Sequence, residues 1–297
     1  MELKGNLSVK IVTHIILMVM SLLAIVPFLL LIVSSFTLQD EILVKGYSLF
    51  PQQFSLEAYQ YLWRQRDQIF NAYGITVIVT LIGTVVNVLL TTLLAYPLSR
   101  PDLPGRKVMT FLVFFTMLFN GGLVPTYLIY TTYFSIKNTL AALLVPSLLM
   151  SSWYVLLCKS YFVNSIPSAV LESARIDGAN DFVIYHKIIL PLGRPIIATV
   201  TLFAGIAYWN DWYNGMIYLT DHKLFSIQNL LYRMLSDIQY MSNIAQMGGQ
   251  VDDLATQIPS TTVRMAIAVI GFLPIVIIYP FVQKNFVKGI AVGAVKG

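Results

Sequence analysis

The carboxylates and histidines of this sequence are the side chains with which it could do chemistry, and their spacing argues against an enzyme. His14, His186 and His222 lie far apart, and none has the spacing with which histidines bind a metal. The sequence contains neither a GxxxxGK[ST] loop for nucleotide phosphates nor a GxSxG elbow for a nucleophilic serine. Glu172 and Asp177 could act as an acid and a base, but they lie in a polar segment without a pocket-forming pattern. We therefore expect no catalytic residue and no metal ligand in this chain.

One carboxylate falls near the end of an apolar segment, in the run Trp209-Asn210-Asp211-Trp212. An ionisable group within a bilayer is costly and marks a pathway, so this run could form a polar patch at the mouth of a translocation path. The alternative is an aromatic belt at the membrane interface with one solvated carboxylate, because Trp and Tyr are common there. The sequence leaves both interpretations open.

The composition indicates that the elements carrying these residues are membrane helices. Of the 297 residues, 57% are hydrophobic and only 11% are charged, whereas soluble proteins carry about 25% charged residues. So few charges cannot cover a water-facing surface, so lipid must face most of the chain. The net charge of +5 comes from dispersed basic residues rather than a basic stripe with interleaved aromatics, which argues against nucleic acid. The single cysteine, Cys158, lies in an apolar run and is expected to pack as a small hydrophobic residue.

Six segments are long and apolar enough to cross a bilayer core, which needs about 20 residues per helix. They cover residues 11–36, 72–98, a third segment from 108 that is broken around 120–125, then 139–162, 192–219 and 262–281. The first is too long for the core of a signal peptide and is expected to be retained as an anchor. Prolines 97 and 101 are expected to end the second, and the stretch 220–260 is expected to be a long polar loop. The predicted fold is an all-α membrane protein with six transmembrane helices.

The distribution of basic residues predicts the orientation of these spans. Six spans place both termini on one side of the membrane. If that side is the cytoplasm, the inner segments hold most of the basic residues, namely Lys4, Lys10, Arg100, Arg106, Lys107, Lys159, Arg175, Lys187, Arg194, Lys284, Lys288 and Lys296. Cytoplasmic loops carry such an excess of Lys and Arg. Both termini are therefore expected to be cytoplasmic.

A short polar helix is expected between the fourth and fifth spans, at about residues 165–178. Ser165 is its expected N-cap with Pro167 in the first turn, and Gly178 is its expected stop in the left-handed conformation. A face of small side chains, Ala169, Ser173 and Ala174, would let another protein approach closely. Physical reasoning leaves two interpretations open, an ordinary connecting loop and a rigid element that passes a push from a soluble partner into the membrane.

This segment resembles the EAA motif of ABC importer permeases, which reads E-A-A-x-x-D-G-A, five residues, an aromatic residue and then I-x-L-P. The matching residues are Glu172, Ser173, Ala174, Asp177, Gly178, Ala179, Tyr185, Ile188, Leu190 and Pro191. Ser173 stands where Ala is usual and Tyr185 where Phe is usual, and both keep the character of the position. A motif of this length and spacing is highly specific.

The resemblance extends over nearly the whole chain. Residues 119–127 look like the family's third-span break, and Ile258-Pro259 with residues 261–266 look like the start of its last span. The ending, residues 284–289 and 293–297, resembles the terminus of sugar permeases. The chain is thus identified as similar to the maltose-type carbohydrate importers, as a MalG-like half of the LplC/YtcP-like branch, with the type I ABC importer permease fold.

The resemblance implies a set of partners in the bacterial cytoplasmic membrane. They are a second, non-identical permease, two ATPase subunits that hold ATP and Mg, and an extracytoplasmic binding protein that delivers an oligosaccharide; no cofactor is implied on this chain. The EAA helix would dock in a cleft of the ATPase and transmit its closure to the spans. The implied division is an N-terminal anchor helix and outer loop (1–71), the permease domain (72–282) and a cytoplasmic tail (283–297).

Two further segments have roles that only the resemblance implies. The tail residues Gly293, Ala294, Val295, Lys296 and Gly297 would reach into the ATPase interface; the alternative is helix packing by glycines at four-residue spacing. The loop 220–260, bent at Gly248-Gly249, would enter the binding protein, or would be a passive linker. A permease for a non-sugar solute is the first alternative. A secondary transporter is a more distant one, because we see neither inverted repeats nor midplane ion sites.

Overall fold

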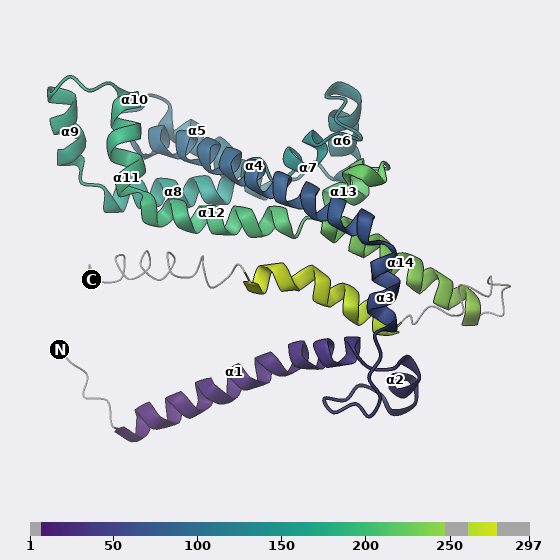
Figure 1. Ribbon diagram of the computed structural model, residues 1–297. Coiled ribbons are helices and arrows are strands. Elements are labelled where there is room, and N and C mark those ends of the chain that lie inside the picture. Colours follow the sequence, from purple (N-terminus) through teal and green to yellow (C-terminus); the bar gives the residue numbers. More distant parts are fainter. Residues whose placement is uncertain (1–6, 247–260, 278–297) are drawn as a thin grey trace. The chain divides into compact units, whose positions relative to one another are not determined.

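The computed structural model describes residues 7–246 and 261–277 of the chain, and these residues are mainly helical (Figure 1). Strand pairing in this part is limited to an isolated bridge between Thr37 and Phe54. The chain divides into two compact units, residues 1–67 with 231–274 and residues 68–230 with 275–297. Each unit is built around different helices and is described separately.

The first unit contains one long apolar helix and several shorter elements. Its helices are α1 (Leu7–Ser35), α2 (Gln39–Lys45), α3 (Glu57–Arg64), most of α14 (Ile227–Gln246) and the helix Thr261–Ile277. The apolar stretch Val9–Ser35 of α1 is 27 residues long; its residues 9–29 are all exposed, and Ser34 and Ser35 at its end are buried. Apolar side chains exposed over such a length are suited to lipid, which agrees with the first predicted span.

Polar contacts order the segment that follows α1. The Ser35 and Tyr59 hydroxyls lie 2.8 Å apart, and the rings of Phe36 and Tyr59 stack at 4.6 Å. The Glu41 carboxylate accepts backbone N–H groups of Gln52 and Gln53 at 2.8–3.2 Å. The hydrogen bond from Gln52 is the main reason that the pKa of Glu41 lies below its usual value. The Glu41 carboxylate therefore holds residues 52–53 against α2.

The second unit holds most of the apolar helices and both candidate sites. Its elements are α4 (Arg66–Ser99), α5 (Arg106–Leu118), α6 (Leu123–Leu128), η1 (Ile129–Tyr133), α7 (Ala141–Leu144), α8 (Ser152–Ser165), α9 (Ser168–Ile176), α10 (Asp181–Ile184), η2 (Tyr185–Ile189), α11 (Leu190–Leu192), α12 (Arg194–Trp209), α13 (Tyr213–Tyr218) and η3 (His222–Leu224). The segments η1 and η2 are π-helical turns, a form often found at functional sites.

A buried core joins α4, α8, η2 and α12 in this unit. It consists of Ala95, Tyr96, Leu98, Val155, Cys158, Phe162, Ile166, Ile184, Tyr185, Ile189, Ile196 and Val200. Cys158 is fully buried here, in agreement with its predicted packing role. Farther along α4, a Cβ built on Gly83 would come within 2.4–2.7 Å of the Tyr208 ring, so α4 and α12 approach closely only because residue 83 has no side chain.

The structure gives a coarser count of spans than the sequence predicts. Two helices, Val9–Ser35 and Arg66–Ser99, are long and apolar enough to cross a membrane by themselves. Three pairs bent by 80° to 113° pass the same test when each pair is taken together, which gives up to five spans in the described residues. The predicted break in the third span is confirmed, because α5 and α6 meet at 113° around residues 119–122.

Three details of the predicted spans are wrong. The fourth segment is not one helix, because residues 145–151 separate α7 from α8; Pro146 lacks an N–H, and Ser147 has φ +62°. The fifth is interrupted at residues 210–212 between α12 and α13. The end of the second agrees with the prediction, because α4 stops at Ser99, between Pro97 in its final turn and Pro101. The stretch 220–260 is not simply a polar loop, because it contains the 20-residue helix α14. Its polarity concealed an amphipathic pattern, with Ile227, Leu230, Leu231, Met234 and Ile238 buried at helical spacing.

Candidate functional site

The segment that resembles the EAA motif forms a short helix set at an angle to its neighbours. Helix α9 follows α8 at a bend of 80°. The predicted N-cap is wrong: Ser165 is the last residue of α8, and Pro167, in the extended conformation, occupies the N-cap position of α9 without a side-chain capping bond. Between them Ile166 is 95% buried in the core (5% exposed). This anchor fixes where the chain turns, so the new helix starts only after it.

The C-terminal end of α9 is held by a Schellman motif. Gly178 has φ +81°, as predicted for a left-handed stop. The Gly178 N–H donates to the Arg175 carbonyl at 3.0 Å, and the Ala179 N–H donates to the Ala174 carbonyl at 2.9 Å. These two bonds satisfy carbonyls that a helix end otherwise leaves unpaired. The angle at which the chain leaves α9 therefore depends on the conformation of one glycine.

The two faces of α9 have different surroundings. Leu171, Ala174 and Ala179 are partly buried and pack against the core. Glu172, Ser173 and Asp177 are exposed on the outer side, together with Ala169. The predicted face of small residues is thus corrected: Ala169 and Ser173 point outward, while Ala174 packs inward. Two large apolar side chains are also exposed, Val170 at 41% and Ile176 at 86%.

The part of the motif that follows the turn, residues 180–191, is anchored on α4. The Asn180 side chain accepts the Val183 N–H at 2.9 Å and so caps α10. The Tyr185 side chain, in the π-helical turn η2, is buried, and its hydroxyl lies 2.8 Å from that of Thr92 on α4. Its ring also lies 5.9 Å from the ring of Tyr96. The motif's last two residues, Leu190 and Pro191, open α11 and are half-buried and exposed, respectively.

An ion-pair network, which sequence reasoning missed, links this segment to the end of α4. The Arg100 guanidinium donates to Asp102 at 2.6 and 3.2 Å and to Asp181 through Nη1. Arg175 Nη2 lies 3.5 Å from Asp102 Oδ2. The hydrogen bond from Arg100 lowers the pKa of Asp102 to about 2. The paired residues are 2, 73 and 81 positions apart in the chain, so the two longer pairings could not be predicted from sequence spacing.

The run Trp209-Asn210-Asp211-Trp212 lies at the break between α12 and α13. Asp211 is half-buried; its Oδ1 accepts the Asn214 N–H at 3.1 Å, and its Oδ2 is buried without a hydrogen-bond partner in the part of the chain described. It is therefore not a freely solvated carboxylate. Trp209 is buried, whereas Asn210 and Trp212 are exposed.

The residues that begin α14 satisfy the backbone of this break. The Ser226 hydroxyl donates to the Asp211 carbonyl at 3.0 Å, and the Asn229 amide donates to the Trp212 carbonyl at 3.0 Å. A Cβ on Gly215 would meet the Asn229 side chain at 2.8–3.0 Å, so the two segments are in close contact. Non-helical backbone at membrane depth is tolerated only where such partners exist.

The two candidate sites lie at opposite ends of one helix. The segment α9–α11 precedes the start of α12, and the polar break follows its end (Figure 1). A helix of 16 residues is about 24 Å long. The structure therefore brings the motif residues 172–191 together as one site and leaves residues 209–212 as a second, separate one.

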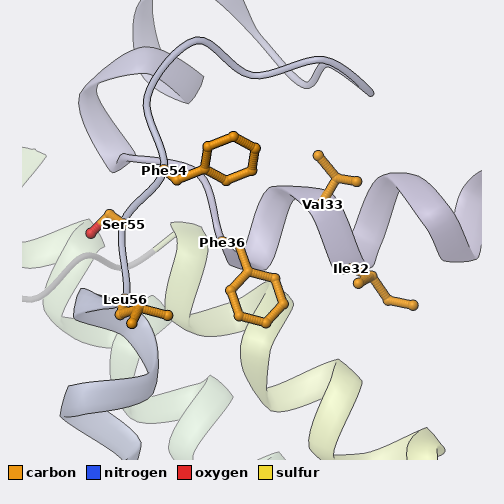
Figure 2. A pocket seen from close by; sticks show the side chains of 6 residues that line it. All are labelled: Ile32, Val33, Phe36, Phe54, Ser55 and Leu56. Carbon is orange, nitrogen blue, oxygen red and sulfur yellow. The ribbon is translucent and has the colours of Figure 1, made fainter.

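Other parts of the described chain offer no equivalent site. A cavity of about 400 Å³ at the end of α1 is lined by Ile32, Val33, Phe36, Phe54, Ser55 and Leu56 (Figure 2). One hydroxyl among apolar side chains cannot satisfy the many hydrogen-bonding groups of a sugar. Residues 7–246 and 261–277 hold no cluster of three metal-ligating side chains. The predicted tail site, Gly293 to Gly297, and the segments Gly248-Gly249 and Ile258-Pro259 lie outside the described residues.

Comparison with known proteins gives one consistent family. The family model "Binding-protein-dependent transport system inner membrane component" matches residues 3–292. The polygalacturonan/rhamnogalacturonan transport system permease protein YtcP of Bacillus subtilis is 39% identical over 95% of this chain and 96% of its own length. Protein LplC of the same organism is 33% identical over 93% of this chain and 90% of its own length.

A solved structure agrees with these sequence relatives. It is the crystal structure of a bacterial ABC transporter involved in the import of the acidic polysaccharide alginate. The matched chain superposes with a TM-score of 0.77, 26% sequence identity, and coverage of 96% of this chain and 99% of that one. The expected type of fold is thereby confirmed, and with it the absence of an enzymatic role, because members of this family are permease subunits. The chain belongs to the family of binding-protein-dependent transport system inner membrane components, and it is a non-catalytic membrane subunit of an ABC transporter.

Proposed function

We propose that the chain is the permease subunit of an ABC importer that carries an oligosaccharide across the bacterial cytoplasmic membrane. The names of its relatives support a carbohydrate: polygalacturonan and rhamnogalacturonan for one, arabinooligosaccharides for another, and alginate for the transporter of known structure. The family name supports delivery of the solute by a binding protein and a location in the inner membrane.

Helix α9 is the site at which an ATPase subunit docks. The observation that carries this assignment is the exposure of Ile176, at 86%, on a short helix that also presents Glu172 and Asp177 to solvent. Phe182, exposed at 71%, lies just beyond the Schellman turn. Burying one such side chain against a partner is worth about 1.5–3 kcal/mol. Because polar side chains surround Ile176, a protein cleft suits it better than lipid.

The remaining parts of the proposal follow the resemblance to type I importers. The chain pairs with a second, non-identical permease above two ATPase subunits, which hold ATP and Mg. It has six spans with both termini in the cytoplasm, and its parts are residues 1–71, 72–282 and 283–297. The break at residues 209–212, with its half-buried carboxylate, belongs to the translocation path.

A reconstituted complex tests the docking site. The chain would be co-expressed with its partner permease and ATPase, and uptake would be measured in proteoliposomes with and without ATP. The variant Ile176→Glu is expected to lose the ATPase on purification, while Ile176→Leu keeps it because the side chain stays apolar. Full retention of the ATPase by Ile176→Glu would show that this face is not the docking surface.

The tail assignment needs its own test. Deleting Gly293 to Gly297 is expected to leave membrane insertion and subunit assembly intact but to lower transport-coupled ATP hydrolysis. A tail ordered between two ATPase subunits would contribute through main-chain hydrogen bonds, each worth about 0.5–1.5 kcal/mol. Unchanged coupled hydrolysis in the truncated complex would remove the tail from the proposal.

A further inference from the structure

The ion-pair network around Arg100 joins three parts of the chain at one point. Arg100 directly follows α4, Asp181 stands in the first turn of α10, and Arg175 stands in the last turn of α9. The Arg100 side chain is only 17% exposed and forms a fork on Asp102, with a further bond to Asp181. Arg175 reaches the same Asp102 at 3.5 Å. Alternating charges thus connect the end of α4 with both α9 and α10, the helices on either side of the Schellman turn.

The backbone connections of α9–α11 to α8 and α12 restrict the movement of α9 less than the ion-pair network does. Helix α9 is joined to α8 at a bend of 80°, and the segment Asp181–Leu192 is joined to α12 at another bend of 80°. If these bends were its only connections, α9 could rotate about them under load without moving a membrane helix. Arg100, together with the contacts of Tyr185 with Thr92 and Tyr96, provides the lateral connection to α4.

We propose that Arg100 is a positioning residue for transport, which makes α4, the loop 100–105 and the α9–α10 segment move as one body. A displacement of α9 by the ATPase then reaches the 34-residue helix α4 directly. This inference rests on the proposed docking of α9. The planar guanidinium suits the role because it binds two carboxylates at once in fixed directions, which a lysine ammonium cannot do.

The exposure of the network distinguishes this role from a purely structural one. The Asp102 and Asp181 side chains are 47% and 62% exposed. Ion pairs with such access to water contribute little to folding, so their loss should leave the fold and the outer face of α9 intact. The low pKa of Asp102 keeps its charge at neutral pH. What the network restricts is the direction in which α9 can move relative to α4.

The test compares three single variants in the reconstituted complex. Arg100→Gln removes every ion pair of Arg100, Asp181→Asn removes only the bond to α10, and Asp67→Asn is the matched control. Asp67 lies at the other end of α4, is 92% exposed and faces Arg66 at 3.8 Å. Two quantities are measured for each complex: the amount of ATPase that co-purifies, and the solute imported per ATP hydrolysed.

We expect Arg100→Gln and Asp181→Asn to keep the ATPase and to import less solute per ATP, by about fivefold or more, the lower end of typical couplings between sites. Asp67→Asn should match the unaltered complex. Equal solute per ATP in all four complexes would overturn the inference, and so would a loss of ATPase in proportion to the loss of uptake. If Arg100→Gln does not assemble, Asp181→Asn decides alone. An unaltered complex without ATP-dependent uptake would instead refute the proposed function.

Discussion

Replacing Gly178 with valine is expected to uncouple ATP hydrolysis from transport while the chain still folds. Gly178 has φ +81°, and a Cβ built on it would meet nothing within 4 Å. The cost of the substitution is therefore conformational rather than steric. A residue with a Cβ pays roughly 1–2 kcal/mol in the left-handed region, and a β-branched residue is a clear outlier there.

The alternative for the variant is to leave the left-handed region and give up the Schellman turn. Two hydrogen bonds are then lost, from the N–H groups of Gly178 and Ala179, at about 0.5–1.5 kcal/mol each. Either route costs about 1–3 kcal/mol. Since 1.4 kcal/mol is a factor of ten, the population of the native geometry of this turn falls by about 5- to 140-fold relative to its alternatives.

The assay is the stimulation of ATP hydrolysis by the loaded binding protein, measured beside uptake in proteoliposomes. Gly178→Asn serves as the conservative variant, because asparagine tolerates the left-handed region, and it should keep most of the activity. Gly46→Val is the positional control: Gly46 also has a positive φ, +76° with ψ −171°, and a Cβ there would meet nothing within 4 Å, but it ends α2 in the first unit. Unchanged stimulation in Gly178→Val, or equal losses in Gly178→Val and Gly46→Val, would refute the reasoning.

Three further outcomes are expected. Glu172→Lys should abolish ATP-coupled uptake without stopping membrane insertion, because the proposed docking of the ATPase would bury this exposed carboxylate, and reversing a charge at a buried contact costs several kcal/mol; normal uptake by a well-expressed variant would contradict this. Gly83→Ala should lower the thermal midpoint, because its Cβ would lie 2.4 Å from the Tyr208 ring and overpacking costs about 1–3 kcal/mol, whereas Gly74→Ala, in open space on the same helix, should not. The pKa of Asp102 is lowered to about 2, so its stabilising contribution is present above about pH 4 and is lost as the pH falls toward 2. The difference in thermal midpoint between the unaltered chain and Asp102→Asn, which is small because Asp102 is 47% exposed, should shrink over that range.

Features that depend on a few adjacent residues could be predicted from the sequence. The left-handed stop at Gly178 follows from a glycine just beyond a short helix. The break between α5 and α6 follows from two consecutive glycines and Pro125, which interrupt an otherwise apolar run. The long helix α1 follows from hydropathy alone, because it needs no partner to satisfy its backbone.

Features that depend on contacts between distant residues could not be predicted. The segments 139–162 and 192–219 look continuous in hydropathy, yet each contains a break whose polar groups are satisfied from elsewhere. The Asn87 amide donates to the Leu148 carbonyl at 2.7 Å in the first break, and the Asn229 amide donates to the Trp212 carbonyl at 3.0 Å in the second. Hydropathy does not report such partners. The start of α9 was misplaced for a similar reason, because the burial of Ile166 is a property of the folded core.

If the proposed function is right, the contacts at the two ends of α12 let this helix transmit a displacement from one end to the other. Its first end is fixed at Gly193, where a Cβ would lie 2.7 Å from the Ile189 carbonyl and 2.9 Å from the Phe162 ring. Its far end reaches the polar break that Ser226 and Asn229 tie to the start of α14. A stiff helix held at both ends cannot shift at one end without shifting at the other. Coupling free energies between two sites are reciprocal. If α9 docks an ATPase as proposed, a partner that displaces Ser226 and Asn229 would change the affinity of α9 for the ATPase, and the ATPase would change the affinity for that partner by the same factor.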